Sequence, residues 1–376
     1  MNSDKNPFII AGYISPAYFC DRTEESKLLL RELSNGNNLA LISTRRMGKT
    51  SLIQHCFHSD EIIESYYTFF VDIYASRSLR DFTFMLSKSI VETLKPYGIK
   101  IFQQFWNHVK SLHAGISFDI VGVPSFHLGL GDIQQPEATL DEIFKYLSIA
   151  DKPCIIAIDE FQQIASYPEK NVEALLRTYI QQCSNAHFIF AGSPQHVMGN
   201  LFLSAARPFY QSVSMMHLQS IALPDYISFA QNLFKVNNRQ IDSETIRAIY
   251  QRFEGVTWYM QKMLHVLYNM TPNGGDCNEE KIDEALQTII DSFRYTYSET
   301  LFRLPEKQKE LLIAIAKEGF AQAVTSGVFV KKYKLSSGSS VQAALKGLLE
   351  KDFITKEAGI YKIYDKFLGI WLLDNY

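Results

Sequence analysis

The residues with the clearest chemical potential lie in the segment Ser43–Ser51, whose sequence is STRRMGKTS. It matches the phosphate-binding pattern GxxxxGK[ST], except that Ser43 replaces the first glycine. Gly48 permits a turn that directs several backbone N–H groups at a polyphosphate, and the start of the following helix favours the same anion. We expect Lys49 to bridge two phosphates and the Thr50 hydroxyl to ligate Mg²⁺. The other loop residues that we expect to line this site are Arg45, Arg46, Met47 and Ser51.

Two carboxylates follow a second apolar run. Residues 154–158 read CIIAI and are followed directly by Asp159 and Glu160. Open α/β sheets bind ligands at the carboxyl ends of their strands, so both carboxylates are expected beside the phosphate loop. Asp159 is expected to hold Mg²⁺, usually through water, and Glu160 to polarise an attacking water. The alternative is a solvated acidic strand end.

Ser193 ends a third apolar run, in the sequence HFIFAGSP. Its short hydroxyl is placed to contact a terminal phosphate or the attacking water. It is equally suited to cap a helix over residues 194–198, and the two roles are compatible.

These residues require a sheet that brings strand ends together. The sequence alternates β-rich runs at residues 39–42, 66–74, 154–158 and 187–191 with helical segments. This alternation predicts an α/β fold with a mostly parallel sheet and helices on both faces. Period-2 apolar positions at residues 116–130 predict a β-hairpin inserted at about residues 115–132, which either serves a partner or folds onto its own domain.

The rest of the chain is mainly helical. We expect a P-loop α/β domain at residues 1–222, a helical lid domain at residues 223–292, and a winged helix at residues 293–376. The winged helix is indicated by helices at residues 306–318, 324–333 and 341–351, followed by strands at residues 353–355 and 360–363.

The motifs together resemble a known family. The segments YFCDRTEESKLLLREL, LISTRRMGKTSLI, CIIAIDEFQQI and FIFAGSPQHVM are similar to those of the AAA+ ATPases of the STAND-related group, specifically the archaeal-type ATPase domain family. The resemblance covers nearly the whole chain. It implies a P-loop ATPase with ATP or ADP and Mg²⁺ as ligands.

The resemblance also implies roles for residues near the start of the chain. The family's hhGRExE motif falls on residues 19–25, with Asp21 in place of glycine and Thr23 in place of the first glutamate. By this likeness, Phe19 and Cys20 contact adenine and Arg22 supports them. Asp21 or Thr23 is also expected to cap the following helix.

Two later segments complete the resemblance. Arg207 matches a family arginine that looks like a finger directed at a γ-phosphate, with a structural salt bridge as the alternative. GVTWYMQ, residues 255–261, matches the lid's GxP element with Thr257 in place of proline. We expect Trp258 and Tyr259 to pack in a core more than to contact the base.

The charge balance of the chain does not favour binding to nucleic acid. The chain has 37 basic and 40 acidic side chains and a net charge of −3, which gives no overall attraction to nucleic acid. Residues 293–376 carry 13 Lys and Arg against 9 Asp and Glu.

From the motifs and the family resemblance, we predict a slowly hydrolysing ATPase that acts as a nucleotide-dependent switch on a protein partner or on its own assembly.

Two alternatives use the same loop. The first is an ATP-regulated DNA-binding protein that acts through residues 331–351, where Lys331, Lys332 and Lys334 precede a helix. The second is a kinase for a small metabolite, for which the sequence offers no acceptor pocket.

The cellular setting is inferred from cysteines and apolar runs. The five cysteines are scattered without a CxxC pair, and no apolar run approaches the roughly 20 residues of a membrane helix. We expect a cytoplasmic protein without a membrane role.

Overall fold

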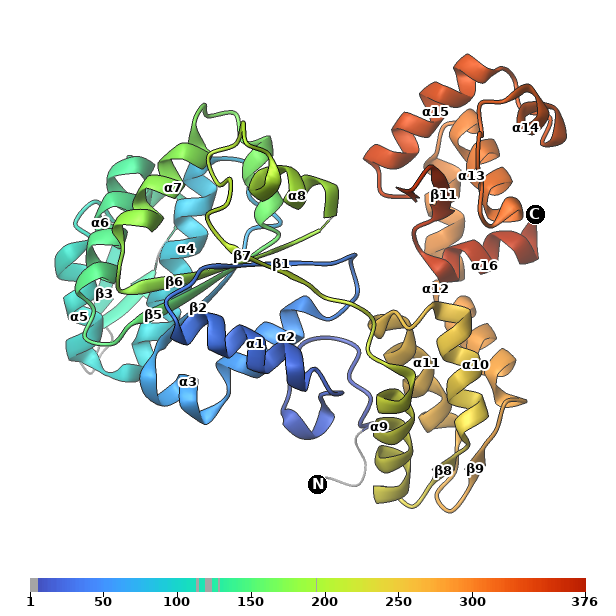
Figure 1. Ribbon diagram of the computed structural model, residues 1–376, viewed down its shortest axis with the longest axis horizontal. Helices are drawn as coiled ribbons and strands as arrows, with labels where there is room; N and C mark the ends of the chain where they lie inside the picture. Colours follow the sequence, from blue (N-terminus) through green and yellow to red (C-terminus); the bar gives the residue numbers. More distant parts are fainter. Residues whose placement is uncertain (1–5, 113–114, 119–123, 128, 194) are drawn as a thin grey trace. The chain divides into compact units, whose positions relative to one another are not determined.

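The computed structural model describes residues 6–112, 115–118, 124–127, 129–193 and 195–376 (Figure 1). They pack as two compact units. The sheet unit comprises Pro7–Phe229 and Gly255–Gln261, and the helical unit comprises Asn6, Ala230–Glu254 and Lys262–Tyr376. The predicted division into domains at residues 1–222, 223–292 and 293–376 stays a prediction.

The sheet unit contains a parallel sheet with the strand order β2-β5-β6-β1-β7. The strands are β1 (Leu39–Ile42), β2 (Tyr67–Asp72), β5 (Cys154–Asp159), β6 (Ala186–Gly192) and β7 (Ser214–His217). The four predicted strands are confirmed, and β7 is an additional edge strand. Because β5 lies inside the sheet, all of its residues are buried, which explains its continuous apolar run.

Helices cover both faces of this sheet (Figure 1). On one face, side chains of α4 (Leu79–Leu94), α6 (Pro136–Ile149) and α7 (Val172–Gln182) share a core with Ile156 and Ile158. On the other, α1 (Thr23–Ser34), α2 (Lys49–Phe57) and α3 (Asp60–Ser65) share a core with Ile155 and Ala157. The α/β fold class is therefore confirmed.

Smaller elements complete the sheet unit. The predicted hairpin is formed by β3 (Gly115–Phe118) and β4 (Pro124–His127), which pair antiparallel, although residues 119–123 and 128 of this segment lie outside the described residues. The remaining elements are α5 (Ile99–His108), α8 (Gln195–Leu203), the start of α9 (Leu223–Val236), and the 3-10 helices η1 (Pro16–Tyr18), η2 (Lys95–Tyr97), η3 (Leu130–Asp132) and η4 (Phe161–Ser166).

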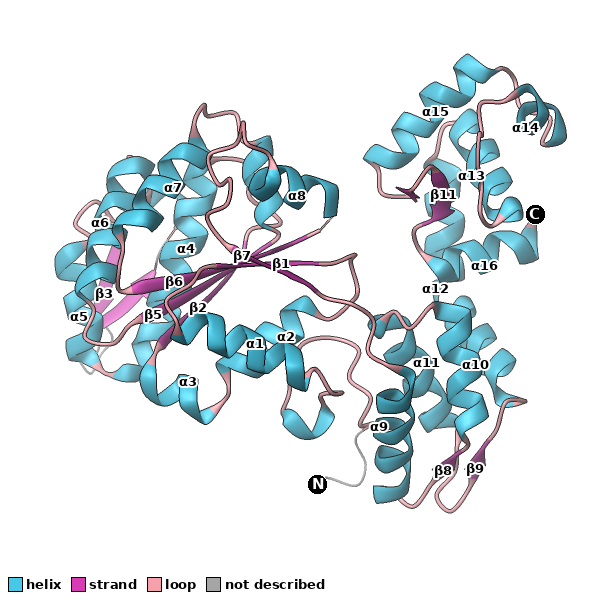
Figure 2. Ribbon diagram, viewed as in Figure 1, coloured by secondary structure: helices cyan, strands magenta, loops and turns pink. Residues whose placement is uncertain are grey.

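The helical unit has two sets of elements (Figure 2). The first set is the end of α9, α10 (Ser243–Phe253), the part of α11 (Thr257–Met270) from Lys262 onward, α12 (Lys281–Arg303), and the short parallel pair β8 (Gln240–Ile241) and β9 (Asp276–Cys277). The second set is α13 (Glu306–Glu318), α14 (Gly327–Lys332), α15 (Gly338–Glu350), the antiparallel strands β10 (Ile354–Glu357) and β11 (Ile360–Ile363), and α16 (Lys366–Asn375). The predicted three helices and two-stranded wing are confirmed, and α16 is additional.

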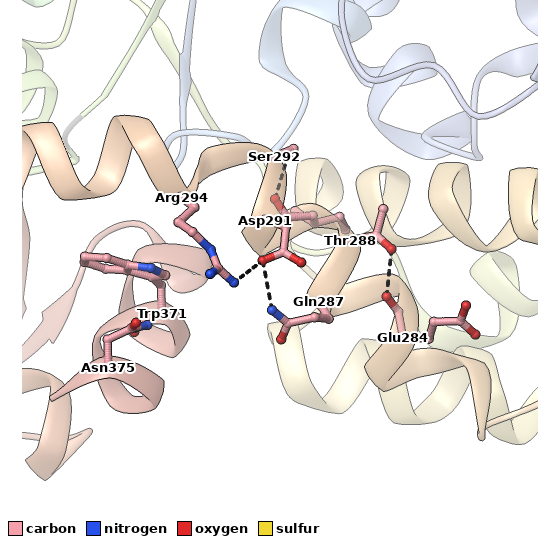
Figure 3. A network of polar contacts seen from close by, with 9 residues as sticks. Glu284, Gln287, Thr288, Asp291, Ser292, Arg294, Trp371 and Asn375 are labelled. Atoms are coloured by element: carbon pink, nitrogen blue, oxygen red, sulfur yellow. Dashed lines mark hydrogen bonds and ion pairs between the residues drawn. The ribbon is translucent and has the colours of Figure 1, made fainter.

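A polar network marks the middle of α12 (Figure 3). Asp291 accepts a hydrogen bond from Gln287 at 3.0 Å and pairs with Arg294. Helix α12 runs unbroken through residues 292 and 293, where we predicted a domain boundary. These contacts lie at the surface of the unit and contribute little to its stability.

Two further expectations concern cysteines and membranes. All five cysteines are free and buried. Within the described part of the chain, no helix combines the length and apolar character that crossing a bilayer requires.

Candidate functional site

The loop between β1 and α2 is shaped by two residues in the left-handed region. Arg46 has a φ of 69° and Gly48 a φ of 92°. Glycine adopts such a φ without steric cost, which is why Gly48 is suited to the turn. Helix α2 starts at the next residue, Lys49, so its free N–H groups point into the loop.

Lys49 is a buried ammonium group. The residue is 7% exposed, and among the described residues its only hydrogen-bond partner is the Ser43 hydroxyl, 3.3 Å from Nζ. Burial lowers the pKa of Lys49, although Asp159 and Glu160 act in the opposite direction. A desolvated charge with one neutral partner is suited to an anionic ligand.

The Thr50 hydroxyl and the Asp159 carboxylate lie side by side at the carboxyl edge of the sheet. Oγ1 of Thr50 donates to Oδ2 of Asp159 over 2.6 Å. Thr50 lies at the start of α2, which follows β1, and Asp159 ends β5. In the sheet only β6 lies between β1 and β5, so the two residues come close together. An adjacent hydroxyl and carboxylate are the oxygen ligands that Mg²⁺ prefers, so this pair fits the ion. The described residues hold no group of three or more His, Cys, Asp and Glu for a metal bound by protein alone.

Glu160 lies at the end of β5 with a φ of 57°. Its carboxylate accepts a hydrogen bond from the side-chain amide of Gln162. Burial raises the pKa of Glu160, against the lowering effects of Gln162 and Lys49. A carboxylate with a raised pKa in a cleft is a good candidate for a proton acceptor.

Ser193 and Gln162 present buried polar atoms at the neighbouring strand end. Ser193 Oγ and Gln162 Oε1 have no hydrogen-bond partner within the described part of the chain. Gln162 Oε1 lies so close to Gly192 that a Cβ there would be 2.3 Å away. A water would satisfy both atoms, and a phosphate oxygen would accept a hydrogen bond from the Ser193 hydroxyl. Residue 194, where the predicted helix after Ser193 begins, lies outside the described residues, and α8 begins at Gln195.

Part of this set lines a cleft of about 220 Å³, to which Ser193 and Gln162 do not contribute. Its lining includes the loop residues Arg45, Arg46, Gly48, Lys49, Thr50 and Ser51, together with Asp159 and Glu160. The structure thus brings the phosphate loop and both carboxylates together.

A second, smaller pocket of about 60 Å³ shares part of this lining. It is lined by Phe19, Cys20 and Arg22, with Met47 of the loop. The Phe19 ring stacks on His55 with centroids 4.2 Å apart. A partly aromatic pocket therefore lies next to the charged cleft.

Arg22 connects this pocket to the phosphate loop. Its guanidinium donates to the Met47 carbonyl over 3.2 Å and pairs with Glu25 at 2.6 Å. The predicted helix cap at Asp21 or Thr23 is wrong, because Arg22 is the N-cap and no side chain caps α1. Asp21 has a φ of 48°, and its carboxylate accepts from the Thr23 hydroxyl at 3.4 Å instead.

The start of α11 also packs on the loop. The Thr257 hydroxyl donates to the Met47 carbonyl at 3.1 Å, and the Trp258 N–H donates to the Arg46 carbonyl at 3.0 Å. The Arg46 guanidinium lies 4.4 Å from the Trp258 ring centroid and donates to the Tyr259 hydroxyl. Sequence reasoning did not assign Thr257 or Gln261 to the site, although both line the cleft and the smaller pocket.

Arg207 forms an ion pair with Glu173 at 2.9 Å. Its side chain is 41% exposed, and it lies outside the lining of both pockets. Burial raises the pKa of Glu173, and the arginine opposes that shift. The structure therefore shows the salt bridge, and a role for Arg207 at a phosphate stays a proposal.

Comparisons with known proteins agree with this fold. A family model described as a probable winged helix domain matches residues 295–374. No curated protein sequence matches the chain.

Three solved structures share the fold over nearly the whole chain. The Walker-type ATPase of Pyrococcus abyssi has a TM-score of 0.66 at 18% identity, covering 98% of this chain and 99% of the other. The ORC2 protein of Aeropyrum pernix, solved as ADPNP–ADP complexes, has a TM-score of 0.59 at 13% identity, with 99% and 97% covered. The ORC1 protein of Aeropyrum pernix, solved in complex with DNA, has a TM-score of 0.52 at 14% identity, with 96% and 93% covered. The predicted resemblance is thus confirmed at the level of fold: the chain is built like these P-loop ATPases and ends in a winged helix.

Proposed function

We propose that this protein binds ATP and hydrolyses it slowly to ADP and phosphate. The observation that carries the proposal is the meeting of buried Lys49 with the Thr50–Asp159 pair at the carboxyl edge of the sheet. The ADPNP–ADP complexes of the ORC2 protein support the choice of ligand. Calorimetry with ADP and a phosphate-release assay with ATP and Mg²⁺ test it, and absence of both binding and release would overturn it.

The residues divide the chemistry among them. The loop N–H groups and the Lys49 ammonium stabilise the negative charge of the phosphates. Thr50 and Asp159 would hold Mg²⁺, which when bound neutralises further phosphate charge. Glu160 accepts the proton of the attacking water, and Ser193 orients that water or the terminal phosphate.

Slow turnover follows from the position of Arg207. Its guanidinium is held by Glu173 and does not line the cleft of its own chain. An arginine near the γ-phosphate is worth about 10³ to 10⁵ in rate where it has been measured. If a second copy lends Arg207, the isolated chain hydrolyses ATP slowly and an assembly hydrolyses it faster.

A switch role is supported by the residues around the end of α10. Glu254 pairs with Lys362 of β11 at 3.3 Å and with Lys366 of α16 at 2.9 Å. Partial burial works against ionisation, but the two lysines lower the pKa of Glu254. The next residues in the chain, 255–261, belong to the sheet unit and contact the phosphate loop. We therefore propose that nucleotide binding reaches the winged helix through Glu254, and from there a protein partner or a second copy.

Replacing Glu254 with glutamine is expected to uncouple the winged helix. ADPNP should change hydrogen exchange at residues 354–366 in the wild type, and Glu254→Gln should remove most of that change. The half-exposed pairs contribute no more than about 1 kcal/mol each to stability, so the fold should persist. Glu244→Gln, which breaks an exposed pair with Arg247 on the same helix, is the matched control. An equal ADPNP response in Glu254→Gln would contradict this route.

DNA binding is a second candidate. A winged helix is present, and the ORC1 neighbour was solved with DNA. In this chain Lys331 and Lys334 are exposed, whereas Lys332 pairs with Glu318 at 2.6 Å. Two or three lysines at the start of the segment 331–351 offer a small phosphate-binding surface.

Charge reversal tests this candidate. If duplex DNA binds here, changing Lys331, Lys332 and Lys334 to glutamate should weaken binding by at least tenfold. It should also make the salt dependence shallower, by about one unit of slope for each lysine that no longer neutralises a phosphate. Reversal of the exposed Lys27, Lys88 and Lys145 in the sheet unit changes the net charge equally and serves as the control. Equally weakened binding in both triple variants would exclude the winged helix as the DNA site.

A further inference from the structure

Gln261 carries a buried polar atom that the proposed reaction does not use. It lies in the first turns of α11, and the residue is 7% exposed. Among the described residues, no hydrogen-bond donor contacts its Oε1 atom. A buried carboxamide oxygen without a partner is unfavourable, so a native structure retains one where a ligand or water completes it.

The position of Gln261 indicates which part of a ligand it meets. Gln261 lines both the charged cleft with Lys49 and the smaller pocket with Phe19. The residues common to the two linings are Ile9, Gly12, Gly48, Ser51, Thr257 and Gln261. A nucleotide with its phosphates in the cleft and its base in the smaller pocket has its sugar at this shared lining.

The other polar side chains at the shared lining are already engaged. The Thr257 hydroxyl donates to the Met47 carbonyl at 3.1 Å, and the Ser51 hydroxyl donates to the Gly12 carbonyl at 3.4 Å. Gln261 is thus the side chain there with an unsatisfied acceptor in the described part of the chain.

We propose that Gln261 recognises a ribose hydroxyl and makes the site prefer ribonucleotides to deoxyribonucleotides. A sugar hydroxyl both donates and accepts hydrogen bonds, so it satisfies either face of the carboxamide. The inference rests on the proposed nucleotide binding and adds a specificity determinant to it. A site built to bind a hydroxyl rejects an analogue that lacks it, because the protein group is then left unpaired.

The test compares ADP with 2′-deoxy-ADP and 3′-deoxy-ADP by calorimetry on the full chain. Wild type should bind ADP about tenfold more tightly than the analogue that lacks the contacted hydroxyl, as expected for one hydrogen bond to a buried group. Gln261→Met keeps the length of the side chain without its amide. It should lower ADP affinity by a similar factor and make ADP and that analogue bind equally. Gln251→Met, on the exposed surface of α10, should change neither value.

The outcomes separate this inference from the nucleotide site itself. If wild type binds ADP in a Lys49-dependent way but binds all three ligands equally, the site stands and the role of Gln261 is overturned. Retained discrimination in Gln261→Met would overturn it too. Purine riboside diphosphate lacks the adenine amino group. If the wild type binds it more weakly than ADP and Gln261→Met removes that difference, Gln261 contacts the base instead of the sugar. No ADP binding in wild type would overturn the inference together with the nucleotide site.

Discussion

Lys49→Ala is expected to abolish measurable binding of ADP and ATP. Removing one partner of a buried charge pair costs about 2–5 kcal/mol, which is about 30-fold to several thousand-fold in affinity. Titration calorimetry measures the loss directly. The reason is the environment of Lys49, whose ammonium group is buried and has one neutral hydrogen-bond partner in the described part of the chain.

The burial of Lys49 also predicts that Lys49→Ala loses nucleotide binding without losing folding stability. Burial lowers the pKa of Lys49, so in the protein without ligand the charged form is disfavoured relative to the unfolded chain. Lys49→Ala should therefore not lower the melting temperature. ADP should raise the melting temperature of the wild type and leave that of the variant unchanged.

A surface lysine provides the control. Lys145 is 70% exposed and pairs with Asp141 on the same helix, away from the cleft lining. Lys145→Ala should bind ADP like the wild type. ADP affinity of Lys49→Ala within twofold of the wild type would show that the phosphates bind elsewhere.

The strands that form the site were predictable because their burial shows in the sequence. Strand β5 is buried on both faces, and it is therefore apolar up to Asp159, its last residue. Strand β7 was not predicted, since an edge strand of four residues with the sequence SMMH has no such run. Helix α16 is apolar on most sides and lacks periodicity, although Asp365 accepts hydrogen bonds from two N–H groups at its start.

Contacts between distant residues limit prediction of the site. The meeting of Thr50 and Asp159 was expected because both residues lie at the carboxyl ends of predicted strands, where open α/β sheets bind ligands. The packing of Trp258 on Arg46 joins residues more than 200 positions apart, and no local pattern encodes it. The partner of Arg207 is Glu173, which belongs to no recognisable sequence motif. The sequence therefore could not decide whether Arg207 contacts a γ-phosphate or forms a structural salt bridge.

Glu160→Gln is expected to keep nucleotide binding and to reduce ATP turnover by about 10² to 10⁴-fold, the usual contribution of a general base. Glutamine matches the size of glutamate but does not accept a proton at neutral pH. Calorimetry with ADP and steady-state phosphate release measure the two effects separately. Glu61→Gln, on the exposed surface of α3, is the matched control and should change neither.

The pH dependence of the rate provides an independent measurement of the same role. Burial raises the pKa of Glu160, and protonated Glu160 cannot accept a proton from water. The wild-type rate should therefore fall with decreasing pH through a pKa above the usual range of a glutamate. The residual rate of Glu160→Gln should lack this acid limb. If Glu160→Gln hydrolyses ATP at the wild-type rate with the acid limb intact, a different group accepts the proton, and the raised pKa of Glu160 reflects its burial alone.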